Sequence, residues 1–329
     1  MLNNFITKII LINCLLSFSI FDTIEDYKIP SSTYTASANL DNLYNFTNPA
    51  CNSLIQNSYI NTQMSNYFDG ILNSHSIFFS LNTKNFKKLN ISIINNSITD
   101  LNNTTNAWYD NGDGIIDVNE IDYNNISNFS HNSLGMILTK SFQLNTSNLP
   151  YLKNSYIKYG INSKLSFSSI LSEKSISHAF DVGILYVNAN YFNSSFAPNI
   201  GIVLKDILPF KYWTTNRYET KKTSIIIGTS INISNILGNQ KSESLINTDI
   251  NIMKLNYSSI GFEHKIKSNK NQLSLNCNFS QIESSVGFLA RMNKKIDIAY
   301  IFIIPTENSL NFSQKINIGI NKDFIRKKI

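Results

Sequence analysis

The sequence predicts an all-β protein, specifically a transmembrane antiparallel β-barrel. Three observations lead to this prediction: an export signal at the start, apolar–polar alternation with a period of two from about residue 56 onward, and alternating segments of about ten residues. A tilted strand needs about this length to cross a bilayer, whereas no segment reaches the roughly 20 apolar residues of a spanning helix. A closed barrel is therefore the expected way across the membrane.

The composition supports a folded chain. Of the 329 residues, 42% are hydrophobic, 12% are aromatic and only 15% are charged, which excludes a disordered polyampholyte. No Pro/Gly/Ser-rich linker or long charge run divides the chain, so we expect one domain at residues 56–325 after the N-terminal part.

The first residues are typical of a secretory signal peptide at residues 1–19. Lys8 precedes an apolar stretch at residues 9–18, and Ser17 and Ser19 supply small residues before a cleavage site. A buried first helix is the alternative. Export predicts that the mature protein resides in the outer membrane.

Alternation is clearest at residues 157–167. One face of this segment carries the apolar residues Ile157, Tyr159, Ile161, Leu165 and Phe167, and the other carries Lys158, Gly160, Asn162, Lys164 and Ser166. No helix separates apolar from polar residues in this way. A dozen or more segments repeat the pattern, and their second faces carry mainly Asn, Ser, Gly, Lys and Asp.

A soluble β-sandwich also alternates, so the period alone does not place the chain in a membrane. The segment lengths, the Tyr and Phe residues near segment ends and the export signal together favour the barrel. We therefore predict that Ile157, Tyr159, Ile161, Leu165 and Phe167 face lipid, whereas Lys158, Asn162 and Lys164 face the lumen.

Charge and cysteine content exclude several other classes. The formal charge is +6, but the Lys and Arg residues are scattered rather than gathered into a stripe, so no nucleic-acid partner is expected. Cys51 and Cys277 remain after signal cleavage, and no Cys/His cluster indicates zinc. We expect both thiols to be unpaired packing residues.

A long acidic loop is expected at residues 99–132. No Lys or Arg occurs between Lys88 and Lys140, and the loop resembles the calcium-binding pattern D-x-[DN]-x-[DN]-G-x5-E. Tyr109 occupies the first ligand position, so Asp110 has to compensate for it. The predicted site is structural and binds calcium weakly, and its alternative is a solvated turn; its ligands are Asp110, Asn111, Asp113, Asp117 and Glu120.

No catalytic motif stands out. The chain has no G-x-S-x-G, H-E-x-x-H, P-loop or dinucleotide fingerprint, and its four histidines are far apart in sequence. The nearest candidate is His75, which lies between Ser74 and Ser76. We expect a non-enzymatic protein, with an outer-membrane hydrolase as a minor alternative.

Several short motifs together resemble the PorV/PorQ family of outer-membrane proteins, which is similar to the long-chain fatty acid transporter barrels. They appear in order as Asn48-Pro49-Ala50, the loop ending in Glu120-Ile121-Asp122-Tyr123, the strands at residues 159–165 and 180–186, and residues 204–207 followed by 213–216. The match departs from the family at Cys51, which replaces a Gly, and at Asn216.

This resemblance implies a barrel of 14 strands whose lumen holds a plug-like segment at residues 20–55. It further implies a role in transport or secretion, with outer-membrane lipid around the barrel and hydrophobic cargo or secretion-machinery proteins as partners. A structural barrel without transport activity is the alternative.

Overall fold

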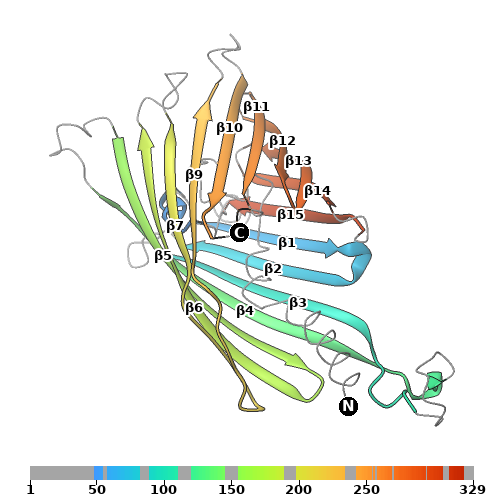
Figure 1. Ribbon diagram of the computed structural model, residues 1–329. Coiled ribbons are helices and arrows are strands. Elements are labelled where there is room, and N and C mark those ends of the chain that lie inside the picture. Colours follow the sequence, from blue (N-terminus) through green and yellow to red (C-terminus); the bar gives the residue numbers. More distant parts are fainter. Residues whose placement is uncertain are drawn as a thin grey trace, which may run out of the picture.

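In the computed structural model, the protein is built almost entirely of strands (Figure 1). The helices in the described part are the short 3-10 turns η1 (Pro49–Leu54), η2 (Phe68–Gly70) and η4 (Tyr123–Asn125). Among the described residues, no helix is long and apolar enough to span a membrane. The structure describes residues 48–54, 58–81, 89–109, 120–144, 155–188, 198–233, 242–253, 255, 258–268, 270–293, 295–306 and 311–321.

The strands follow one another in chain order. They are β1 (Tyr59–Tyr67), β2 (Leu72–Leu81), β3 (Leu89–Asn103), β4 (Ser127–Leu144), β5 (Ser155–Ile170), β6 (Glu173–Asn188), β7 (Asn199–Trp213), β8 (Tyr218–Glu219), β9 (Ser224–Asn232), β10 (Ser242–Asn251), β11 (Ser259–Lys267), β12 (Gln272–Ser280), β13 (Glu283–Met292), β14 (Ile296–Pro305) and β15 (Ser313–Asn321).

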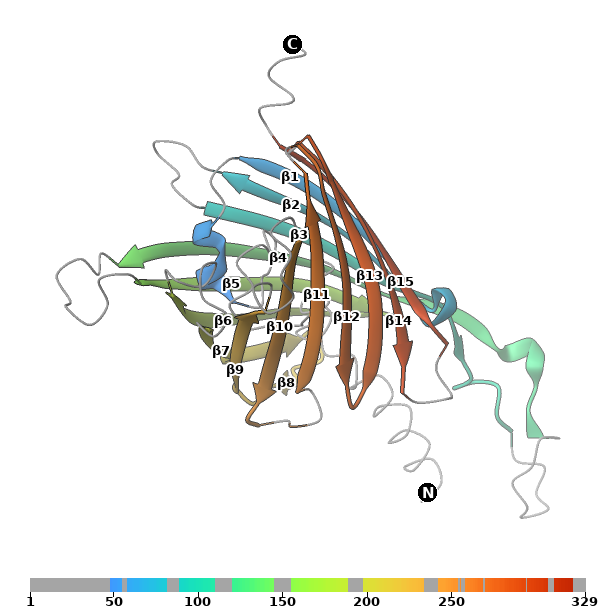
Figure 2. The ribbon, with the colours of Figure 1, turned by 90° about the horizontal axis from the view of Figure 1, so that it is seen from above.

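Neighbouring strands pair antiparallel around a closed wall (Figures 1 and 2). The first strand pairs with the last, β1 with β15, and the wall continues through β6–β7 and β7–β9. The two-residue β8 pairs only with β7, so 14 of the 15 strands form the ring. This confirms the predicted fold class and strand number.

The wall has the reverse polarity of a soluble protein. On β5, Lys158, Asn162 and Lys164 are buried and face inward, whereas Tyr159 and Ile161 are exposed and face outward. The same inversion runs around the barrel, where buried Asn and Ser alternate with exposed Ile, Leu and Phe. Because lipid replaces water outside such a wall, apolar side chains are stable there. The predicted assignment of faces on this strand is confirmed.

The wall is not equally high all round. Strands β3–β7 have 15 to 18 residues, whereas β9–β15 have 9 or 10. We call the end of the barrel at Tyr67 the far end. Toward it, the outward positions of β4 change from Leu134 to the exposed polar residues Asn132, Ser130 and Asn128. The long strands therefore project beyond the apolar belt, and we call this projecting part the overhang.

Substituting one outward residue at two depths tests the membrane placement. Ile161→Lys near the middle of β5 should lower the free energy of folding into lipid vesicles by about 2–4 kcal/mol, because a charge enters the bilayer core. Ile157→Lys, on the same face near the end of the strand, should cost only about 0–1 kcal/mol. Urea titration in vesicles measures both. Equal, small costs would contradict the barrel, because exposed positions of a soluble sandwich tolerate lysine.

Candidate functional site

The N-terminal residues that the structure describes lie inside the barrel. The turn η1 packs on the inner wall against β4, β5 and β6 (Figure 2). There it contacts Gly160 of β5 and Gly183 of β6, which are directly paired across the two strands. A Cβ at Gly160 would overlap the Pro49 backbone, and one at Gly183 would overlap the Asn48 side chain. The glycine pair is therefore a seat that admits the segment because it carries no side chains.

Polar and apolar contacts hold the segment on this seat. The Asn48 amide donates to the Ile184 carbonyl oxygen at 3.3 Å, and its Oδ1 accepts from the Ala50 N–H at 2.9 Å. The Cys51 N–H closes the turn onto the Asn48 carbonyl oxygen at 3.0 Å. Ala50 and Cys51 then pack in a small buried cluster with two apolar residues of β6, Leu185 and Val187.

The pKa of the Cys51 thiol reflects how completely the segment is buried on this seat. Burial raises the pKa of its thiol from 9.0 to about 12, although the nearby positive charge of Lys158 acts in the opposite direction. The thiol therefore stays protonated at neutral pH and is a poor nucleophile. Neither Cys51 nor Cys277 is part of a disulfide bond in the structure.

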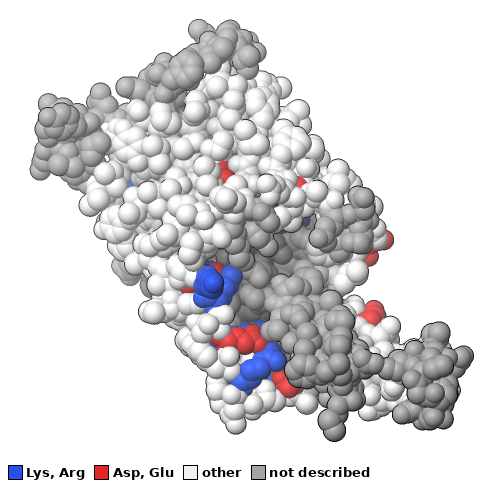
Figure 3. Space-filling view, in the orientation of Figure 1, with Lys and Arg blue, Asp and Glu red and all other residues white. Residues whose placement is uncertain are grey.

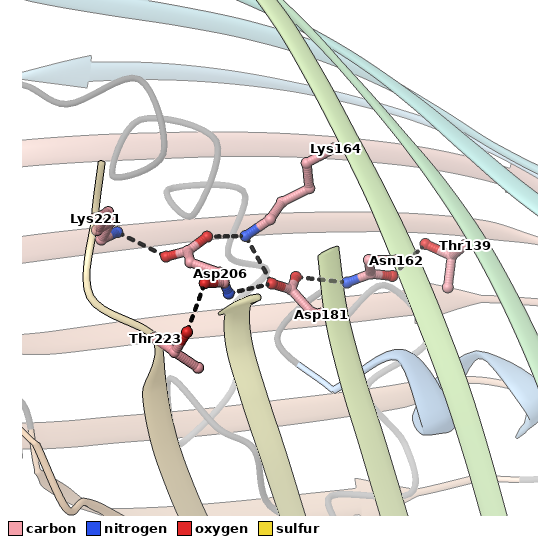
Figure 4. Close-up of polar contacts among 7 residues, drawn as sticks. All are labelled: Thr139, Asn162, Lys164, Asp181, Asp206, Lys221 and Thr223. Atoms are coloured by element: carbon pink, nitrogen blue, oxygen red, sulfur yellow. Dashed lines mark hydrogen bonds and ion pairs between the residues drawn. The ribbon is translucent and has the colours of Figure 1, made fainter. Parts of the chain in front are cut away.

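Beside the seat, a buried ionic network crosses the inner wall from β4 to residues 221–223, just before β9 (Figure 4). Lys164 Nζ lies 2.7 Å from Asp181 Oδ1 and 2.5 Å from Asp206 Oδ1, and Lys221 Nζ lies 2.9 Å from Asp206 Oδ2. Asn162 donates to Asp181 Oδ2 at 3.1 Å and accepts from Thr139 at 2.7 Å. Two ammonium groups thus face two carboxylates, and the pairing offsets the cost of burying them.

The network sits where strand β7 is irregular. Its register against β6 shifts twice, between Phe180 and its neighbours at 178 and 182, so β7 carries two bulges. Asp206 and Leu208 have φ values of 54° and 50°, in the left-handed region that ordinary side chains rarely adopt. Side chains contribute at this point, because Thr223 Oγ1 donates to the Asp206 carbonyl oxygen at 3.0 Å.

The pairing of β7 with β9 ends at this bulge. The last pair is Lys205 with Ser224, and β7 next pairs on that side with β8, at Lys211 and Glu219. Within the described part of the chain, residues 206–210 have no strand partner there. The Lys221–Asp206 ion pair and the Thr223 hydrogen bond therefore connect the wall where the backbone hydrogen bonds between β7 and β9 end.

At the far end, charged side chains gather on the inner wall of β7 and β8. Figure 3 shows Lys, Arg, Asp and Glu together over the lower ends of β6 and β7, while the rest of the described face carries few charges. Lys211 Nζ lies 4.3 Å from the centre of the Trp213 ring, Arg217 Cζ lies 5.2 Å from it, and Arg217 pairs with Glu219.

Another part of the inner wall at the far end is apolar. A buried cluster joins β1–β3 to β14, and it consists of Tyr67, Leu72, Ile98, Ile301 and Ile303. Phe68 and Leu101 pack against it. The mouth of the barrel therefore offers a charged wall and an apolar wall.

Most of the predicted calcium ligands lie outside the described residues, namely Asp110, Asn111, Asp113 and Asp117. The neck of the loop is described: the Tyr109 N–H donates to the Glu120 carbonyl oxygen at 3.0 Å, and Trp108 pairs with Ile121. The loop thus closes at the first and twelfth positions of the predicted pattern. Among the residues that the structure describes, no group of three metal-ligating side chains occurs.

The structure does not bring the proposed hydrolytic residues together. His75 is exposed on the outward face of β2, whereas Ser74 and Ser76 point inward. Sequence reasoning did not single out another pair, in which Ser244 Oγ lies 2.8 Å from His264 Nδ1. Ser244 pairs directly with His264, which lies between the inward-facing residues Glu263 and Lys265, so this pair points away from the lumen. The described residues thus offer no Ser–His pair that faces the lumen at these sites.

These features define a closed transmembrane β-barrel that holds an N-terminal turn in its lumen. Comparison with solved structures places the fold beside the P. putida toluene transporter TodX, at a TM-score of 0.52 and 7% identity over 90% of this chain and 99% of that one. Two porins, KdgM in complex with oligogalacturonate and an Rh. blastica porin mutant, match 80% of this chain at TM-scores of only 0.32. No protein-family model and no curated protein matches the chain.

Adding one methyl group to each glycine of the seat should release Cys51. In a Cys14→Ser, Cys277→Ser background, Cys51 is the only one of the three cysteines left. A pKa of about 12 instead of 9.0 keeps the thiolate fraction about a thousandfold lower, so maleimide labelling of the parent should be very slow. Gly160→Ala with Gly183→Ala should raise the labelling rate about a hundredfold or more.

The matched control is Gly261→Ala, which adds the same methyl group to the inner face of β11, away from the segment. Its labelling rate should equal that of the parent. Fast labelling of the parent, or no gain in the glycine double variant, would show that residues 48–51 are not held on the seat.

Proposed function

We propose that the protein is a bacterial outer-membrane transporter whose lumen is closed by its N-terminal segment and whose cargo is hydrophobic. The observation that carries this proposal is the seat of residues 48–51 on Gly160 and Gly183, because a barrel with a filled lumen and no passage has no need of a fitted internal segment. The fold likeness to TodX, a toluene transporter, supports it.

Two further features support this role. The apolar cluster at the far end, which includes Tyr67, Leu72 and Ile301, makes one part of the inner wall near the mouth apolar, as hydrophobic cargo requires. The 23-residue connection at positions 104–126 also lies at the far end, and long loops of bacterial barrels are extracellular. In this orientation cargo enters from outside, and the N-terminal segment guards the periplasmic half of the lumen.

A role in secretion is the second candidate. It rests on the PorV/PorQ resemblance and on the aromatic residues that the long loop exposes, Trp108, Tyr109 and Tyr123. Exposed aromatic side chains are enriched at protein–protein interfaces, so the loop offers a contact for cargo or for secretion machinery. Transport of small molecules predicts cargo inside the barrel, whereas secretion predicts a complex on this loop.

Deleting residues 20–55 should raise the conductance of the protein in planar bilayers. The inner wall is lined by Asn, Ser and Lys, so water and ions pass once the segment is gone. Gly160→Ala with Gly183→Ala should give a smaller increase, and Gly261→Ala should give none. Unchanged conductance after the deletion would favour a structural barrel filled by its own side chains.

We also propose that the acidic loop binds calcium weakly, with a Kd of about 0.1–1 mM. Bound calcium would offset the mutual repulsion of the carboxylates and protect the loop from proteases. Protease cleavage should slow in millimolar calcium for the parent and for Asp122→Asn, whose carboxylate lies outside the twelve positions and caps Asn124. Glu120→Gln should abolish the protection. Cleavage that ignores calcium in the parent would leave only a solvated turn.

A further inference from the structure

A row of hydrogen-bond donors crosses the inner wall of the overhang near the far end. Ser168 of β5 pairs with Ser175 of β6, and Ser175 pairs with Trp213 of β7. All three side chains face inward and are at least nine-tenths buried. Because directly paired residues have Cβ atoms about 5 Å apart, the three polar groups form one continuous patch.

These donors have no partners. Ser168 Oγ, Ser175 Oγ and Trp213 Nε1 are buried and make no hydrogen bond in the described structure. The neighbouring pair on the same strands is satisfied, since Ser166 Oγ and Ser177 Oγ lie 2.5 Å apart. A buried donor without a partner is destabilising and is uncommon in native proteins. Three such groups in adjacent positions can all donate to one bound acceptor.

Lys211 adds positive charge to the same patch. Its side chain is only 5% exposed. Lys211 lies two residues before Trp213 on the same face of β7 and pairs with Ser177 of β6. The nearest carboxylate oxygen, on Glu219, is 3.9 Å from Nζ, too far for a hydrogen bond, and the described residues offer it no hydrogen-bond acceptor. Glu219 is already engaged by Arg217. The charges of Lys211, Arg217 and Glu219 sum to +1.

We propose that Ser168, Ser175, Trp213 and Lys211 form a binding subsite for a small, soluble, monovalent oxyanion. The indole N–H can only donate and the ammonium can only donate, so the missing partner is an acceptor. One net positive charge matches one negative charge. Hydroxyl groups rather than apolar side chains surround the donors, and the apolar cluster lies on β1–β3 and β14, so the ligand is a polar anion and not an amphiphile.

The buried Lys164 network shows what a completed site looks like. There each ammonium lies within 2.9 Å of a carboxylate oxygen, so that network has no place for an added anion. The Lys211 patch lacks this internal match. It lies at the rim, where the Arg217 side chain is 46% exposed, so an anion that enters the mouth meets it first. The subsite does not depend on the proposed hydrophobic cargo.

The fluorescence of Trp213 can be used to follow anion binding. The chain has two tryptophans, Trp108 and Trp213, so a Trp108→Phe background isolates its fluorescence. Titration of the full-length, detergent-solubilised protein with sodium acetate, at constant ionic strength against sodium chloride, should give a saturable change in emission. Lys211→Gln should weaken acetate binding about tenfold or more, because a hydrogen bond to a charged group is lost.

Lys315→Gln is the matched control. Lys315 also faces inward and lies over an aromatic ring, Tyr67, at 4.7 Å, but on β15. Its substitution should leave the acetate response unchanged. Ser175→Ala is a smaller change that preserves the charge, and it should also weaken acetate binding. It tests the subsite even if Lys211→Gln impairs folding. A heat-modifiability gel shift confirms that each variant forms the barrel.

Three results would overturn the subsite: no response to acetate, an equal response in Lys211→Gln and the parent, or a response to octanoate alone. Stronger binding of inorganic phosphate than of acetate would overturn its monovalent character. Because none of these measurements uses conductance, they can fail while the transporter proposal holds, and the reverse is also true.

Discussion

The whole structure depends on the pairing of its first strand with its last. In lipid no water satisfies a free backbone N–H or carbonyl group, so a sheet with an open edge is not stable there. The β1–β15 ladder removes that edge, and Asn61 and Asn317 reinforce it through reciprocal amide hydrogen bonds of 2.6 and 2.8 Å on the lumen side. Nearby, Tyr59 Oη donates to Asp297 at 2.9 Å, beneath Gly319, which leaves room for the ring. Everything else is arranged inside this ring.

Strand β7 shows how the ring tolerates a defect. Its bulges leave residues 206–210 without a partner on the β9 side among the described strands. The backbone ladder of the ring is therefore interrupted there. Lys221 and Thr223 reach back to Asp206 and replace backbone bonds with side-chain bonds. Lys164 and Asp181 hold Asp206 from the other side. A charged network is therefore part of the wall, and its position explains why these residues are buried.

Period and polarity were enough to predict the fold and the two faces, because each alternating segment carries its own signal, as residues 157–167 do. The seat was predicted only in part. Asn48-Pro49-Ala50 and Gly160 belong to motifs that resemble a family, but the pairing of Gly160 with Gly183 follows from register, which no short motif reveals. The network was missed for the same reason, since Lys164, Asp181 and Asp206 are 42 residues apart at their widest. Inward lysines and aspartates on neighbouring strands were the available signal.

Because the wall is unequal in height, the barrel presents different sides to its surroundings within the plane of the membrane. Lipid surrounds a belt of nearly constant thickness, but the surrounding solution meets a crescent formed by β3–β7, with a lower rim at the 9- and 10-residue strands on the other side. A molecule at the membrane surface beside the short strands meets the lower part of the wall. A molecule on the opposite side meets the polar outer faces of the long strands, at residues such as Asn132. Neighbouring membrane components therefore face different surfaces depending on their bearing around the barrel axis.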